Sequence, residues 1–509
     1  MPNTRRVAGN ALGLVLLCLH LLICTGAVAA IALSIAPSAG LAGMVEQDSL
    51  FFRVMVPALS VALLATGLRY IHYYYCWFRT RPDFCDQRYV SAAGLRLREQ
   101  PFLKFQITTK GGALPVVERC LRELDAFCRA HPRIAERISA EVITEVEDEV
   151  GMLQDQFRKS ALRVLTIVLP AHYATPNGTG LKARALHYMV EKRRAGFNAK
   201  PGETFIVHMD EETLITEREL LVLLDYLSRD PRPVSQGPIF YPLDWRSTPW
   251  MCRALECIRP FGCSECASVM RNPPPAHLHG SNLVVEETAE NQIGWDFGCI
   301  DGQPFVAEDL LFGLRAYAVL GEHAFGWHGA VMLEQPALSA YWAFRQRKRW
   351  VQGALQALRV IWDREEFADI SRPAKLRLHF RIAYRIGTYA LGFPIGMTGI
   401  AFFLQNLTAA SPDRWLATLH NPLESSLIVG AAAWLVSYQI GLVRNLRFQH
   451  LPWYEMGRQS LIVLALTPLA GLLETVGPFI AVTESMFGIS KANWVPTPKL
   501  AKTRQPVGA

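Results

Sequence analysis

The chain has 509 residues, of which 50% are hydrophobic and 19% are charged. This composition is too apolar for an ordinary soluble enzyme and too charged for a bundle embedded wholly in a membrane, so we expect a soluble domain joined to membrane helices. The net charge of +7 is modest, and basic residues beside apolar segments usually mark the cytoplasmic side of a membrane. We therefore expect membrane lipids, and no nucleic acid, among the partners.

The N-terminal region contains two apolar segments. Residues 11–36 carry no charge and are long enough to span a bilayer. The alternative is a cleaved signal peptide, because two arginines precede the run and small residues lie within it. A second segment covers residues 54–77, and basic residues follow it. Together they predict a transmembrane hairpin over residues 1–80 with both ends in the cytoplasm.

The next segment, residues 81–360, alternates between two patterns. The runs "FLKFQITT", "AEVITEV", "LRVLTIVLP" and "TFIVHMDEE" are strand-like, whereas "LPVVERCLRELDAFCRA" and "LKARALHYMVEKRR" have helical periodicity. This alternation predicts an α/β domain with a parallel sheet and helices on both faces. Ligands bind at the carboxyl ends of such strands, so we expect Thr108, Glu145 and Asp210 to face one crevice.

Two pairs of acids stand at places suited to chemistry. In "HMDEET", Asp210 and Glu212 follow a predicted strand and could hold a Mg²⁺ or Mn²⁺ that also binds a diphosphate. In "FVAEDLLFGLRAY", Glu308 and Asp309 begin an amphipathic helix, where a carboxylate could accept the proton of an attacking hydroxyl. The alternative for both pairs is helix capping, because the helix dipole favours acids at its N-terminus.

The stretch "FRQRKRWVQG" concentrates positive charge. Four cationic side chains lie within five consecutive positions: Arg345, Arg347, Lys348 and Arg349. On a helix, Gln346, Arg349, Trp350 and Gly353 share one face. One interpretation is a basic helix that touches lipid headgroups. The other is that the cluster neutralises a leaving diphosphate through Arg349, while the indole of Trp350 lines an acceptor site.

The C-terminal region is again apolar. Basic and apolar residues at helical spacing predict interfacial helices over residues 361–384. Membrane spans are predicted at 385–405 and 425–443 within a membrane region that ends near 490. Residues 460–486 contain two prolines and several glycines and form either a further span or a broken re-entrant pair. A tail of residues 491–509 follows.

The ordered set "HMDEET", "AED" and "QRKRW" resembles the membrane-bound family-2 glycosyltransferases, which include cellulose and hyaluronan synthases. The similarity is closer to the egghead-type β-1,4-mannosyltransferases, through "ITTKGGALP", "FIVHMDEETLITE", "HGSNLVV" and "FGCIDGQPFVAEDLLFGLRA". The resemblance implies a GT-A-like cytoplasmic domain, with a mixed, mostly parallel sheet and helices on both faces, beside an α-helical transmembrane region. The implied reaction is an inverting transfer of mannose from GDP-mannose. It also implies β-1,4-mannosidic linkages on a lipid-linked or glycan acceptor, in a multi-pass membrane protein that lies in the plasma membrane if the source is bacterial.

The resemblance also implies roles for single residues. Asp309, with Glu308 beside it, would be the catalytic base, and Asp210 and Glu212 would hold Mg²⁺ or Mn²⁺. The nucleotide sugar would contact Thr108, Thr109, Lys110, Glu145, Lys182, Arg184, Asp210, Gln346 and Arg349. The acceptor would contact Trp350, His279, Gly280 and Ser281, with a purely structural histidine as the alternative for His279.

The sequence departs from the family pattern in three places. Asp-Glu-Glu replaces the common Asp-x-Asp, Glu145 stands where an Asp is common, and "NWVPTPK" is a short match to a gating loop. A UDP-glucose-dependent β-glucan synthase is the alternative function. A non-catalytic membrane scaffold or transporter is a further one, although the intact acids and "QRKRW" argue against it.

Cysteines are the last feature. The chain has 11 of them, scattered along its length, which argues against a disulfide framework and favours a reducing compartment. Four gather in "CRALECIRPFGCSEC", where Cys263 and Cys266 alone have the spacing of a zinc-binding pair. From the cysteines alone we expect small buried residues on a helix and no zinc.

Overall fold

The computed structural model describes residues 68–69, 71–80, 90–95, 101–196, 202–229, 231–408, 422–489 and 498–499. The predicted span at 11–36, most of the span at 54–77 and all but the end of "NWVPTPK" lie outside the described residues.

A seven-stranded sheet with the order β10-β5-β7-β4-β1-β2-β3 forms the centre of the α/β region. β7 runs antiparallel to β4 and β5, while the other neighbours are parallel, which confirms the predicted mixed, mostly parallel sheet. Its strands are β1 (Phe102–Thr108), β2 (Ile138–Thr144), β3 (Arg163–Val168), β4 (Thr204–Asp210), β5 (Val234–Gln236), β7 (Leu283–Glu286) and β10 (Phe325–Trp327). Two small sheets pair β6 (Ile239–Phe240) with β11 (Met332–Leu333) and β8 (Cys299–Ile300) with β9 (Gln303–Pro304).

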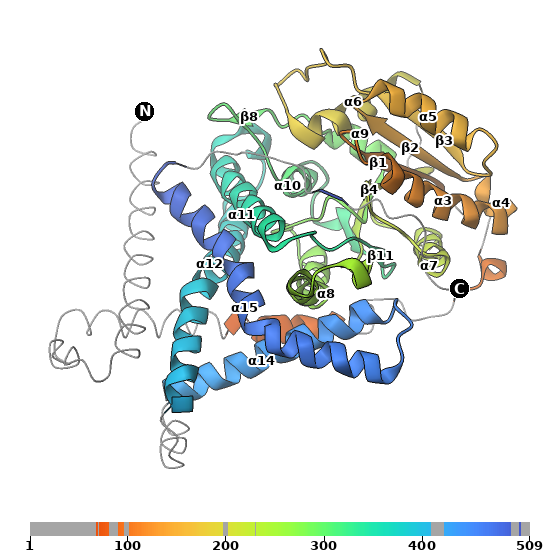
Figure 1. Cartoon of the computed structure of the whole chain (residues 1–509). Helices are drawn as coiled ribbons and strands as arrows, with labels where there is room; N and C mark the ends of the chain where they lie inside the picture. The colour runs from red at the N-terminus through yellow and green to blue at the C-terminus, as the bar shows by residue number, and fades with distance from the viewer. Residues whose placement is uncertain are drawn as a thin grey trace, which may run out of the picture.

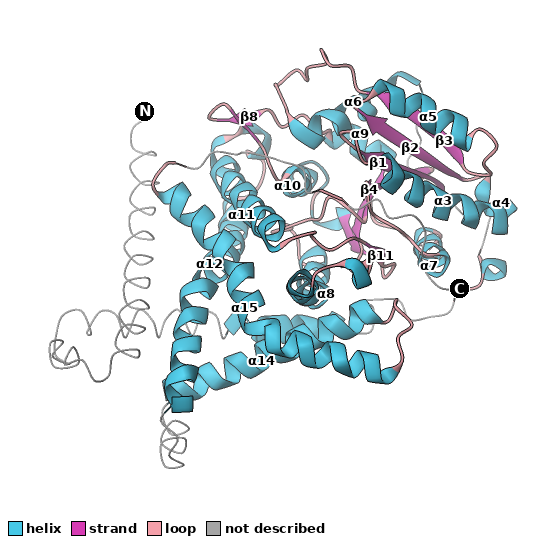
Figure 2. Ribbon diagram, viewed as in Figure 1, coloured by secondary structure: helices cyan, strands magenta, loops and turns pink. Residues whose placement is uncertain are grey.

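Loops connect the elements, and helices surround this sheet (Figure 2). They are α3 (Leu114–Ala130), α4 (Pro132–Ala135), α5 (Glu147–Phe157), α6 (Leu181–Gly196), α7 (Glu217–Leu227), α8 (Trp250–Arg271), α9 (Glu287–Ile293), α10 (Glu308–Leu320), α11 (Ala340–Asp363), α12 (Arg372–Thr408), α14 (Pro422–Leu446) and α15 (Trp453–Met486), with short 3₁₀ helices at Ala92–Gly94, Trp245–Ser247, Glu322–Ala324 and Glu365–Phe367.

The two faces of the sheet are packed differently. Alternate residues of β1, such as Phe105 and Ile107, are fully buried in the main hydrophobic core, which also contains apolar residues of α3 such as Leu121, the helix beside β1 in Figure 1. On the other face, Arg193 of α6 donates to Gln106 Oε1 (2.8 Å) and Glu141 Oε2 (2.9 Å). A buried charge needs such partners, so this network fixes α6 against β1 and β2.

The helices α8, α11, α12, α14 and α15 form the second part of the molecule. α11 and α12 pack on α15, and α8 packs on α14 and α15. Within the described ranges, α15 is the one helix whose length and apolar composition suit a membrane span. Residues 460–486 belong to this continuous helix, so they do not form a broken pair. The spans predicted within α12 and α14 stay predictions, as do the domain boundaries.

An ion network joins three of these helices. Arg347 of α11 is fully buried, and its guanidinium donates to Glu256 of α8 (2.9 Å) and to Glu474 of α15 (2.8 Å). The network therefore connects the helix that carries "QRKRW" to the membrane-type helix α15.

Candidate active site

A cavity of about 480 Å³ opens where β1 and β4 end. Thr108 and Asp210 are register partners at these two strand ends, so parallel pairing alone places them side by side. The cavity brings together the predicted residues Thr108, Thr109, Lys110, Glu145, Lys182, Asp210, Glu212, His279, Gly280, Ser281, Glu308, Asp309, Gln346, Arg349 and Trp350. Arg184 is not part of the lining; it forms an ion pair with Glu145 (3.1 Å) at the rim.

Lys182 stands at the centre of the polar end. Its ammonium forms an ion pair with Asp210 and donates to the carbonyl oxygen of Gly280 (3.2 Å). Burial would raise the pKa of Asp210, but the charge and hydrogen bond of Lys182 outweigh it and lower that pKa. Asp210 is therefore an ionised carboxylate at neutral pH.

Gly280 allows the acids and this lysine to converge. A Cβ at position 280 would lie 3.3 Å from Lys182 Nζ, 3.7 Å from Asp309 Oδ2 and 3.8 Å from Glu308 Oε1. Any larger side chain there would occupy the space between these groups. The absence of a side chain at Gly280 thus keeps a gap open between the two pairs of acids.

Asp309 lies in the first turn of α10, and its Oδ1 accepts a hydrogen bond from the backbone N–H of Leu310 (2.8 Å). Burial, followed by the charge of Glu308, raises the pKa of Asp309 to about 7. A carboxyl group with this pKa is partly ionised at neutral pH and can accept a proton from a hydroxyl.

Close packing holds α10 in this position. A Cβ at Gly353 of α11 would lie only 2.3 Å from the Cβ of Ala307, the residue before Glu308. The glycine of "RWVQG" therefore allows α11 to touch the start of α10, which places the two helices' polar residues on one cavity.

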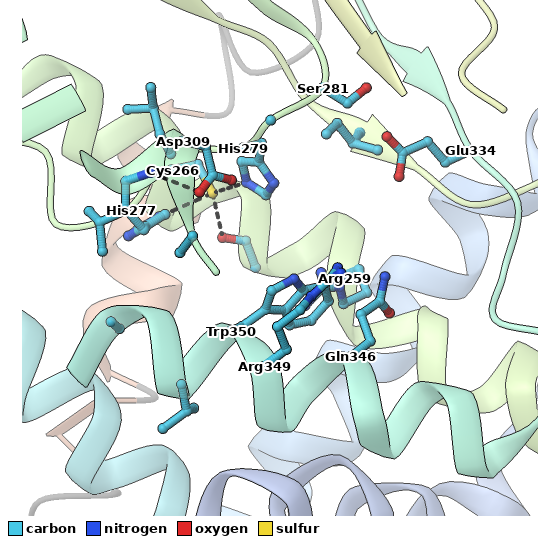
Figure 3. Close-up of a pocket in the computed structure, with 18 of the residues that line it drawn as sticks. Arg259, Cys266, His277, His279, Ser281, Asp309, Glu334, Gln346, Arg349 and Trp350 are labelled. Carbon is cyan, nitrogen blue, oxygen red and sulfur yellow. Dashed lines mark hydrogen bonds between the residues drawn. The ribbon is translucent and has the colours of Figure 1, made fainter. Parts of the chain in front are cut away.

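The cationic cluster separates into different environments. Arg347 is buried in the ion network described above, Lys348 pairs with Glu484 (2.6 Å), and Arg345 bonds to Tyr341 (3.2 Å). Arg349 is the one member that lines the cavity, where it projects from α11 beside Gln346 and Trp350 (Figure 3). Of the four cations, Arg349 is therefore the one placed to meet a ligand in the cavity, and its contact with a leaving diphosphate stays a prediction.

Cations also flank the indole of Trp350. The guanidinium of Arg259 lies 3.9 Å from the ring centroid, and that of Arg347 lies 5.1 Å from it. These cation–π contacts orient the ring. Trp350 lines the cavity, and its contact with an acceptor stays a prediction.

Several lining residues escaped the sequence analysis. Glu211 accepts a hydrogen bond from Thr109 (2.7 Å), and Lys499 forms an ion pair with Glu212. Burial, with the charges of Glu212 and Asp210 next, raises the pKa of Glu334 to about 8. A signal existed for Glu334, which directly follows the strand-like run "AVML". No local pattern marks Arg259, which lies in the middle of α8.

The cavity continues from the acids to the second part of the molecule. Its other lining residues include Tyr389 of α12, Trp434 of α14 and Gly471 and Thr475 of α15. One continuous space therefore joins the strand ends to the helix with membrane-type composition.

A family model described as glycosyl transferase family group 2 matches residues 205–480. Among curated proteins, β-1,4-mannosyltransferase egh of Drosophila melanogaster is 28% identical over 260 residues, 50% of this chain and 52% of that protein. β-1,4-mannosyltransferase bre-3 of Caenorhabditis elegans is 27% identical over 336 residues, 64% of this chain and 65% of that protein. The chain thus spans about half to two thirds of the length of these relatives.

Among solved structures, S. aureus TarS in complex with UDP is 14% identical to this chain, with a TM-score of 0.32. The match covers 69% of this chain and 93% of that one.

Proposed function

The chain belongs to glycosyl transferase family group 2, and from this premise we propose that it transfers mannose from GDP-mannose with inversion, forming a β-1,4-mannosidic linkage. Relatives with the printed name β-1,4-mannosyltransferase support the sugar and the linkage. The observation that carries the proposal is the cavity itself, in which Asp309, Asp210 and Arg349 meet at the strand ends.

In this proposal the acceptor hydroxyl attacks the anomeric carbon from the face opposite the diphosphate. The new C–O bond forms as the bond to the diphosphate breaks, so the α-linked donor gives a β-linked product. Asp309 accepts the hydroxyl proton, which its pKa of about 7 permits. Arg349 offsets the charge that develops on the leaving diphosphate, because its planar guanidinium can donate two parallel hydrogen bonds.

We propose Mg²⁺ or Mn²⁺ as the cofactor. Asp210, Glu212 and Glu334 line the same cavity, and carboxylate oxygens are the donors that these cations prefer. Asp210 and Glu212 would hold the cation, and a bound cation would offset diphosphate charge. Chelation with EDTA should stop transfer and added Mn²⁺ or Mg²⁺ should restore it, whereas full activity in the chelator would contradict the site.

We propose a lipid-linked acceptor that enters from the membrane side. The support is that the cavity continues from the acids to residues of α12, α14 and α15, of which α15 has the length and apolar composition of a membrane span. A glycan built on a lipid can present its hydroxyl to Asp309 while its lipid stays with these helices. Multi-pass insertion with the α/β region in the cytoplasm is part of the same proposal.

A donor panel tests the function. Purified protein in nanodiscs should transfer label from GDP-mannose to a lipid-linked acceptor and prefer it over UDP-glucose. Asp309→Asn is the matched control, because it keeps the side-chain shape and removes the base. Preference for UDP-glucose would favour a β-glucan synthase. No turnover with any nucleotide sugar would favour a scaffold or transporter.

A further inference from the structure

Beside the acids, the cavity wall contains a second cluster of chemically distinct groups. Cys263 and Cys266, one turn apart on α8, are both buried. The two sulfurs and a ring nitrogen of His279 all lie within 4.8 Å of one another. The Cys266 sulfur is 3.0 Å from His279 Nε2 and 3.2 Å from His277 Nε2. Figure 3 shows both imidazoles turned toward that sulfur.

Both sulfurs and His279 lie close enough to one another to share a metal ion, and His277, which contacts the Cys266 sulfur, would shift toward the other two to complete a set of four. Two sulfurs and two imidazole nitrogens form a set that Zn²⁺ binds tetrahedrally. The other two cysteines of "CRALECIRPFGCSEC" serve as an internal comparison. Cys252 and Cys257 are equally buried on the same helix, yet neither belongs to the cluster, and the Cys257 thiol donates to the Arg253 carbonyl oxygen (3.1 Å).

We propose that Cys263, Cys266, His277 and His279 bind one Zn²⁺, at a site separate from the acids proposed to hold Mg²⁺ or Mn²⁺. The sequence could not indicate it from the cysteines alone, because the histidines come from the loop that follows α8. On binding, each thiol loses its proton to solvent and ligates as a thiolate. The resulting Cys₂His₂ site has no open position, which makes it structural.

The location gives the metal a specific task. It would fasten α8 to the segment 277–281, whose last two residues, Gly280 and Ser281, lie at the polar end of the cavity. The Gly280 carbonyl oxygen accepts from Lys182 (3.2 Å), and the Ser281 hydroxyl bonds to that of Thr213 (2.9 Å). His279 then acts as a ligand that positions this segment, in place of the acceptor contact that the sequence predicted.

The metal content of the purified protein tests the proposal independently of its transfer activity. The full chain, purified in detergent without a metal-binding tag, is analysed by inductively coupled plasma mass spectrometry after a brief EDTA wash that removes Mg²⁺ and Mn²⁺. We expect about one zinc per chain. Cys266→Ser and His277→Asn should lower zinc content at least about tenfold, while the matched variant Cys252→Ser should keep it.

Cobalt supplies a second readout that does not depend on zinc recovery. Protein loaded with Co²⁺ alone should show a thiolate-to-metal charge-transfer band, which Cys263→Ser should abolish and Cys252→Ser should retain. Equal zinc in Cys266→Ser and the parent chain would overturn the proposal. So would parent protein purified under reducing conditions that contains no zinc, because the thiols would then be available and still not bind it. Failure of mannose transfer with zinc present would reject the proposed function and leave this site standing.

Discussion

At the scale of single residues, Asp309 is the side chain on which the proposed reaction depends most. Asparagine keeps its shape but cannot accept the hydroxyl proton. Loss of a general base costs about 10²–10⁴-fold in rate, so Asp309→Asn should lose that much transfer while GDP-mannose binding persists. Transfer rate and donor affinity are measured on the same preparation. The exposed Asp301 pairs with Arg359 away from the cavity, so Asp301→Asn is the control. Normal turnover in Asp309→Asn would remove it from the mechanism.

The same carboxyl group predicts the dependence on pH. Burial raises the pKa of Asp309 to about 7, and only its ionised form can accept a proton. The ratio kcat/KM should therefore fall as the pH drops below about 7 and level off above it. The residual kcat/KM of Asp309→Asn should not show this fall at low pH. If kcat/KM of that variant fell with pH in the same way, the titrating group would be another residue.

Arg349 and its neighbours give a second test at this scale. Lysine keeps the charge but not the planar fork, and loss of one contact to developing charge costs about 10²–10³ in rate. Arg349→Lys should therefore lose transfer, and Trp350→Leu should as well. Arg345→Lys is the matched control, because Arg345 bonds to Tyr341 outside the cavity. Rates are normalised to folded protein, and equal behaviour of all three variants would mean that α11 does not line the active site.

At the scale of elements, the contact between α10 and α11 depends on Gly353. Glycine in a helix interior normally costs up to about 1 kcal/mol relative to alanine. At Gly353 we expect alanine to be the less stable residue, because an added Cβ would lie 2.3 Å from Ala307 Cβ. Overpacking costs about 1–3 kcal/mol, and α10 would move together with Asp309. We therefore expect Gly353→Ala to lower both the thermal midpoint and the transfer rate.

A glycine in open space provides the comparison for this prediction. Gly457 lies in α15, and an added Cβ there would meet no described atom within 4 Å. Gly457→Ala should keep or raise the thermal midpoint in detergent. If Gly353→Ala also raised it, the helices would not be in the contact that the structure shows.

At the scale of the whole molecule, the ion network of Arg347 joins α8 and α11 to the membrane-type helix α15. Removing one partner of a buried pair costs about 3–5 kcal/mol, because the other charge is left unpaired. Arg347→Met would strand Glu256 and Glu474, both of which now accept from it. We expect a large drop in the thermal midpoint and in the yield of folded protein.

Two further variants separate charge from packing. Arg345→Met removes a neighbouring cation outside the network and should have little effect. Adding Glu256→Gln and Glu474→Gln to Arg347→Met removes the stranded charges and should recover much of the lost stability. No recovery would mean that Arg347 acts through packing and not through its charge.

The predictable part of the fold and site came from local patterns. Four of the strands of the main sheet and the helices α3 and α6 follow periods of two and 3.6 residues, and parallel pairing of the strands brings Thr108 to Asp210. Acids at a strand end or a helix start, such as Asp309, were visible for the same reason. The antiparallel strand β7 has only four residues, too few for a period to distinguish it from a loop, so it was missed.

By itself, then, the sequence determined the glycosyltransferase family, the α/β region and most residues at the strand ends, because each depends on neighbours along the chain. Tertiary structure decided which cation of "QRKRW" meets the cavity. Neighbouring residues of a helix point to different sides, so the sequence alone does not say which side faces the cavity. The ion pairs of Arg347 with Glu256 and Glu474, and of Lys348 with Glu484, turn those two cations away from it. Tertiary structure also brought Lys499 to Glu212, 287 positions apart, and placed two histidines at the Cys266 sulfur. No local period encodes such contacts, because they form only when distant elements share one packed core.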